Sequence, residues 1–227
     1  MNYLSHYYAD LSNKEPAYAL GKILPDLARM VNPAIRLRVG DISKEAHRPL
    51  HWLNKGVKTH HRMDAIFHNS DFFFRHTRYI RSLMNEQSFG RPHKYFNFFA
   101  HLLLEMILDR VLIRQHPDIA HAFYRDLNAV PVDLLTNFER QHHFGLNAEV
   151  LYHALQRFVA ARYLFSYTGN EQLVFAFNRI VLSTGISGFD EEDKTILASL
   201  IDQIEKKLWQ SYSTIFDTLR IKLANEE

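Results

Sequence analysis

The scarcity of helix-breaking residues constrains this chain most strongly. Its 227 residues include only eight glycines and seven prolines, which fall between stretches where apolar residues recur with the period of an α-helix. No segment has the alternating pattern of a strand ladder. The sequence therefore predicts an all-α fold. We expect one multi-helix bundle over residues 1–227, because no linker, repeat or low-complexity segment divides the chain.

Proline and glycine also indicate where the helices begin and end. Pro16 suits the first turn of a helix that Pro33 would end. The final segment carries one apolar stripe that includes Ile196, Leu200 and Ile204. The helices expected from these signals span about 16–31, 43–84 with a break near 68–70, 93–115, two short stretches beginning at 117 and 131, 147–163, 170–182 and 190–223.

Several classes of protein are disfavoured by composition. The absence of cysteine excludes thiolate zinc sites, iron–sulfur clusters and cysteine nucleophiles, so any bound metal must take nitrogen and oxygen ligands. Residues 1–6 lack the basic and apolar regions of a secretory signal. The longest apolar segment, 102–113, contains Glu105, Asp109 and Arg110 and is too short to cross a bilayer. We therefore expect a cytoplasmic protein.

The net charge is small but its distribution is uneven. A formal charge of +2 does not indicate nucleic acid as a partner. One stretch nevertheless concentrates basic residues, and it is either a solvated face or a docking surface for an acidic protein. The basic residues of this stretch are Arg29, Arg36, Arg38, Lys44, Arg48, Lys55, Lys58 and Arg62.

Two rows of histidines and carboxylates have the spacing of one helix face. Residues four apart on a helix lie one turn above each other. The rows are His60, Asp64 and His68, and His101, Glu105 and Asp109. Imidazoles and carboxylates are ligands of zinc, manganese and iron, and facing helices of a bundle often hold such ions. The rows therefore predict a metal site.

The second row lies among apolar residues, so Glu105 and Asp109 should be at least partly buried. A buried carboxylate without a counter-charge costs several kcal/mol, so a cation must lie close by. The cation can be a metal. The alternative is an ion-pair network with Arg110, Arg114 or a basic residue of another helix.

The order of four segments resembles a known family. The segments are Met1-Asn2-Tyr3-Leu4-Ser5-His6, Gly21 to Asp26, His60-His61-Arg62-Met63-Asp64, and Glu105, Asp109 and His116 on one helix. In order and approximate spacing they are similar to the bacterial acyl carrier protein phosphodiesterases. That family is distantly similar to the all-helical HD-type metal-dependent phosphohydrolases. The resemblance covers about the first 120 residues.

The resemblance implies an HD-like fold and a metal-dependent phosphodiesterase. Its reaction would release 4′-phosphopantetheine from holo-acyl carrier protein, an acidic protein partner, and its cofactor would be Mn²⁺, with Zn²⁺, Fe²⁺ or Mg²⁺ as alternatives. Arg62 would stabilise phosphoryl charge, and His61 or His101 would protonate the leaving alkoxide. The metal ligands would be His6, Asp26, His60, Asp64, His68, Glu105 and Asp109.

Some positions depart from the family pattern. The family usually has Asp at positions 68 and 105, His at 110 and Asn at 22, where this chain has His68, Glu105, Arg110 and Lys22. Another oxygen or imidazole ligand preserves metal chemistry, whereas Arg110 removes a proton donor or ligand. A relative acting on another phosphoester is therefore an alternative. Two further alternatives are a zinc-dependent phospholipase or nuclease, which would normally be secreted, and a non-catalytic helical binding module.

Overall fold

The predicted all-α class is confirmed by a computed structural model that describes residues 1–41, 47–87 and 89–225. No strand occurs in these ranges. The helices are α1 (Tyr3–Ala9), α2 (Pro16–Gly21), α3 (Leu24–Val31), α4 (Arg48–His68), α5 (Asp71–Glu86), η1 (His93–Tyr95), α6 (Phe96–Gln115), α7 (Pro117–Asn128), α8 (Leu134–His142), α9 (Ala148–Ala161), η2 (Tyr163–Thr168), α10 (Asn170–Ser183), α11 (Glu191–Trp209) and α12 (Tyr212–Ala224).

Most predicted helices are confirmed, and the break near 68–70 separates α4 from α5. Ser70 caps α5 by accepting a hydrogen bond from the Phe73 amide. The predicted start at Ser43 lies outside the described residues. The short α1 was not predicted, because its few residues carry too little periodic signal.

Two long predicted helices are wrong, because each is divided in two. The 16–31 segment breaks between α2 and α3, where Pro25 lacks the N–H that would bond to the Gly21 carbonyl. The 190–223 segment breaks between α11 and α12. There the Ser211 backbone leaves the helical region with φ −138°, and its N–H bonds to the Leu208 carbonyl.

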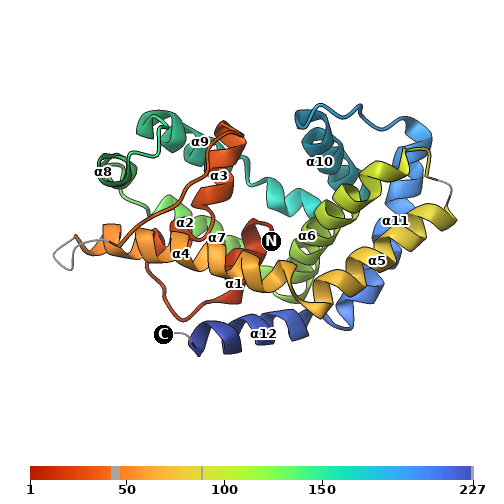
Figure 1. The fold of residues 1–227 in the computed structure, drawn as a ribbon, viewed down its shortest axis with the longest axis horizontal. Coiled ribbons are helices and arrows are strands. Elements are labelled where there is room, and N and C mark those ends of the chain that lie inside the picture. Colours follow the sequence, from red (N-terminus) through yellow and green to blue (C-terminus); the bar gives the residue numbers. More distant parts are fainter. Residues whose placement is uncertain (42–46, 88, 226–227) are drawn as a thin grey trace.

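The apolar helix α6 forms the centre of the core. It packs against α1, α5, α7, α11 and η2, and most of its side chains are buried. The amino terminus lies in the middle of the molecule, beside α1 and α6, while α12 runs along α4 (Figure 1). Because α4 and α6 both adjoin this central region, their polar rows can meet there. No helix in the described ranges is long and apolar enough to span a membrane.

Helices α2 and α4 touch backbone to backbone. A Cβ atom on Gly56 would lie 2.5 Å from the Tyr18 carbonyl oxygen and 2.8 Å from the Gly21 Cα. Only glycine allows this approach. The contact brings Lys22, at the end of α2, beside His60 on α4.

Candidate metal centre

Four predicted ligands from three helices meet beside the amino terminus. His6 lies on α1, Asp26 on α3, and His60 and Asp64 on α4. Ligand atoms of His6, Asp26 and His60 all lie within 4.8 Å of one another. The His60 Nε2 atom lies 3.5 Å from Asp64 Oδ2 and 3.9 Å from Asp26 Oδ1. We call these four residues the first group.

The orientation of His60 is fixed from behind. Its Nδ1 atom lies 2.8 Å from the Lys22 carbonyl oxygen, which can only accept, so Nδ1 carries the proton in this bond. In the neutral ring, Nε2 therefore presents a lone pair towards the carboxylates. Burial lowers the pKa of His60 well below its usual value, which favours this neutral ring. A backbone carbonyl behind an imidazole is the common support of a metal-ligating histidine.

His6 is fully buried, and its polar contacts are poorly aligned. Its ring stacks on His60 with centroids 4.1 Å apart. Its Nε2 atom lies 3.2 Å from Asp64 Oδ1, but neither ring nitrogen has a well-aligned hydrogen-bond partner among the described residues. A buried imidazole left in this way is costly. A cation between these side chains would satisfy both histidines.

A second group joins α4 to α6 through His68, His101 and Glu105. The His68 and His101 Nε2 atoms are 3.0 Å apart, and they lie 3.2 Å and 2.8 Å from Glu105 Oε1. Their ligand atoms also converge within 4.8 Å. All three side chains are partly exposed, so this group faces solvent more than the first.

The Met1 α-ammonium links the two groups. It lies 2.7 Å from Asp64 Oδ1 and 3.0 Å from Glu105 Oε1. Burial lowers the pKa of this ammonium, but Glu105, Asp64 and Asp26 outweigh burial and raise it to about 11. The Met1 ammonium is thus a cation supplied by the protein itself among these carboxylates. Its position was not predicted from the sequence.

The carboxylates of the centre differ in their proton affinity. Burial, together with the charges of Asp64 and Glu105, outweighs the Met1 ammonium and raises the pKa of Asp26 to about 7. For Asp64, the Met1 ammonium and His6 outweigh burial and lower the pKa. Crowded carboxylates of this kind attract a cation.

Asp109 lies outside both groups although it shares a row with Glu105. Its carboxylate accepts from the Leu4 amide at 3.0 Å, from the Ser5 amide at 2.7 Å and from the Ser5 hydroxyl at 2.6 Å. It therefore holds the first turn of α1, which carries His6, in place. The four-residue spacing correctly placed Asp109 on the same face of α6 as Glu105. It could not show that α1 covers Asp109.

Three other residues that the family resemblance singled out, His61, Arg62 and Arg110, make contacts outside the two groups. A His61 ring nitrogen bonds to the Leu37 carbonyl, and the Arg62 guanidinium donates to the Leu223 carbonyl. Arg110 is buried and pairs with Glu205 on α11, with Nε and Oε2 2.9 Å apart. Arg110 therefore belongs to an ion-pair network with Glu205, as the alternative to a metal site predicted. His101 instead contacts Glu105 in the second group.

Comparison with known proteins gave no match: no family model, no curated protein and no solved structure resembles the chain closely enough to be matched.

Proposed function

We propose that this chain is a metal-dependent phosphodiester hydrolase whose cation is held by the first group. One observation carries the proposal: the Nε2 atoms of buried His6 and His60 lie 3.2 Å and 3.5 Å from the Asp64 carboxylate, and neither ring nitrogen of His6 has a well-aligned hydrogen-bond partner among the described residues. Two imidazoles with two carboxylates are a ligand set for manganese, zinc or iron.

The residues of the first group fit a divalent cation. His6, His60, Asp26 and Asp64 would hold it, with the Lys22 carbonyl keeping His60 in the required tautomer. When bound, the ion would supply Lewis acidity, polarising a phosphoryl oxygen and lowering the pKa of a water molecule. Its binding would take over the role of the Met1 ammonium beside Asp64.

The second group suits proton transfer to the leaving group. His101 is partly exposed, and its Nε2 atom lies 2.8 Å from Glu105 Oε1, so the carboxylate orients the ring. A protonated His101 can donate to a departing alkoxide. His68 and Glu105 with His101 are also a ligand set for a second cation. The proton-donor role is proposed because these side chains are open to solvent.

The substrate proposed is holo-acyl carrier protein, from which 4′-phosphopantetheine would be released. The resemblance supports this substrate, and the surface charge agrees with it. Arg29, Arg36 and Arg38 are exposed, and Arg29 is close enough to Asp26 to lower its pKa. An acidic carrier protein would be steered towards such a face and would bind more weakly at high salt.

A non-catalytic helical module is the second candidate. The Met1 ammonium favours it, because this cation lies 2.7 Å from Asp64 and 3.0 Å from Glu105. In that case the polar rows would be an internal ion-pair network that needs no metal. The two candidates differ in whether the polar rows bind Mn²⁺ and whether hydrolysis follows.

The test measures hydrolysis of bis(p-nitrophenyl) phosphate with added Mn²⁺, followed by the mass of holo-acyl carrier protein after incubation. We expect Asp64→Asn to lower kcat/KM by roughly 100-fold or more, because it removes an anionic ligand of the cation. Asp41→Asn is the matched control, since Asp41 is exposed and pairs with Lys58. Hydrolysis unchanged in Asp64→Asn, or absent from the wild type, would refute the hydrolase. An unchanged carrier mass alone would refute only the substrate.

A further inference from the structure

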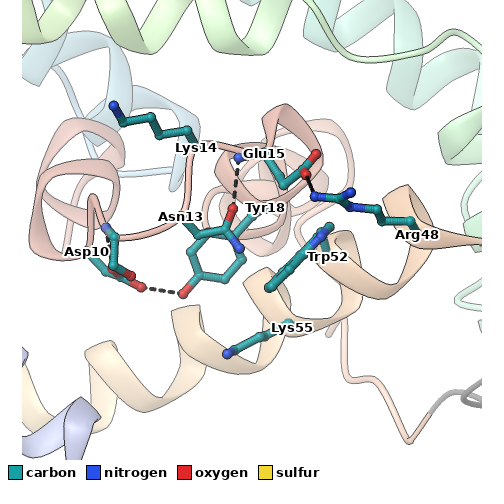
Figure 2. A pocket seen from close by; sticks show the side chains of 9 residues that line it. Asp10, Asn13, Lys14, Glu15, Tyr18, Arg48, Trp52 and Lys55 are labelled. Atoms are coloured by element: carbon teal, nitrogen blue, oxygen red, sulfur yellow. Dashed lines mark hydrogen bonds and ion pairs between the residues drawn. The ribbon is translucent and has the colours of Figure 1, made fainter.

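A polar hollow of about 660 Å³ lies on the outer side of the α2–α4 contact. Its walls are the α1–α2 connection with Asp10 and Glu15, Tyr18 of α2, and one face of α4. Figure 2 shows these side chains around the open space. None of them belongs to the first or second group of the metal centre. The volume is in the range of small-molecule sites.

The α4 wall presents one aromatic and two basic side chains. Arg48, Trp52 and Lys55 have four- and three-residue spacing and therefore share a helix face. The Trp52 indole is only partly buried, and it meets the Tyr18 ring edge-on at 6.1 Å. The Lys55 Nζ atom lies over one face of the Trp52 ring, 5.6 Å from its centroid. A flat apolar surface thus stands beside positive charge.

The acidic side chains of the hollow already have partners. Asp10 accepts from the Tyr18 hydroxyl at 2.6 Å and from the Ser12 hydroxyl at 2.6 Å. Glu15 Oε1 pairs with Arg48 at 2.5 Å, as Figure 2 shows. Three basic side chains line the hollow, Arg48, Lys55 and Lys14 at its rim, against the two acidic ones.

A further cation lies beneath the hollow. The Lys22 ammonium is buried and donates to the Asp10 carbonyl at 2.5 Å and to the Tyr7 carbonyl at 3.1 Å. Asp10 and Asp126 lie near the Lys22 ammonium, while the lining residues themselves carry three basic and two acidic side chains, a formal charge of +1. An anionic ligand is favoured there.

We infer that this hollow binds a small phosphate monoester that carries a flat ring, of the mononucleotide class. The ring lies on the Trp52 indole, and the phosphate is held by Lys55 and Arg48. Both parts of the ligand contribute, because the ring uses the aromatic wall and the phosphate uses the cations. The inference does not depend on the proposed hydrolase activity.

The test titrates AMP, adenosine and inorganic phosphate into the full chain in buffer with a chelator. In a Trp209→Phe background Trp52 is the one remaining tryptophan, so its fluorescence reports ring stacking. We expect AMP to quench it and to bind at least tenfold more tightly than adenosine or phosphate. Calorimetry should show Trp52→Leu and Lys55→Met each weakening AMP binding about tenfold.

Two control variants locate the site. Lys206→Met changes an exposed lysine of α11, and Asp64→Asn changes the metal centre, so both should leave AMP affinity unchanged. Circular dichroism would verify that each variant is folded. Absence of AMP binding in the wild type would overturn the inference. So would phosphate binding as tightly as AMP, or AMP affinity that Asp64→Asn lowers and Lys55→Met does not.

Discussion

Asp109 and Asp64 are both aspartates of the polar rows, yet their surroundings give them different roles. Asp64 faces His6, His60 and the Met1 ammonium, whereas Asp109 accepts three hydrogen bonds from Leu4 and Ser5. The four-residue spacing was enough to predict that His60 and Asp64 share a site. It could not reveal the depth of each side chain, since that depends on which helix covers it.

Asp109→Asn should therefore destabilise the fold. The NH₂ of the new amide would face the buried N–H of either Leu4 or Ser5, so the free energy of unfolding should fall by about 2–4 kcal/mol. Urea denaturation followed by circular dichroism measures it. Asp217→Asn, an exposed aspartate paired with Arg220, should cost less than about 1 kcal/mol. Equal stability of the two variants would show that Asp109 does not anchor α1.

His76 predicts a pH dependence of stability. Burial, with smaller contributions from Arg75 and Lys207, lowers its pKa to about 4, and its Nε2 atom lies 3.1 Å from the Ser211 hydroxyl. In the unfolded chain its pKa is about 6.5, so between pH 6.5 and 4 the unfolded state binds more protons. The His76 contribution is therefore present above pH 6.5 and lost as the pH falls to about 4.

The measurement compares unfolding of the wild type and His76→Gln at pH 7 and pH 4.5. The wild type should lose about 2 kcal/mol more than the variant, because the variant lacks this titration. The other histidines are common to both chains, so their effect cancels in the difference. Parallel stability profiles would contradict a neutral, buried His76.

At the scale of elements, the sequence predicted the middle of the chain better than its ends. A long apolar stretch preceded by Gly90 and Pro92 located α6, whereas the break after Gly21 was missed. That break matters for the site, because it turns the Lys22 carbonyl towards His60 and starts α3, which carries Asp26. Local pattern cannot distinguish one long helix from two helices that pack differently.

The α2–α4 contact predicts a sharp difference between two glycines. Gly56→Ala would drive Cβ into the Tyr18 carbonyl and Gly21, so it should cost about 3 kcal/mol and weaken Mn²⁺ binding through His60. Gly40→Ala has open space and should change stability by less than about 0.5 kcal/mol. Thermal unfolding and Mn²⁺ titration of the two variants measure both effects. A Gly56→Ala variant as stable as Gly40→Ala would contradict the close packing.

At the scale of the whole molecule, the two polar groups lie close together because α1, α3, α4 and α6 converge on one region beside the amino terminus. The row spacing predicted which residues of α4 and α6 share a face, and the resemblance supplied His6 and Asp26. Neither could place the Met1 ammonium between Asp64 and Glu105. The packing of the helices determines whether a metal ion or the Met1 ammonium neutralises the carboxylates. A metal centre requires the first, and an ion-pair network requires only the second.

Isothermal titration of the metal-free full chain with Mn²⁺ tests this central claim most directly. The account predicts at least one bound ion per chain, with affinity lowered at least 100-fold in His60→Ala and unchanged in His61→Ala, whose ring contacts Leu37 instead. Binding that is absent from the wild type, or equally strong in His60→Ala, would contradict a metal centre built on the first group.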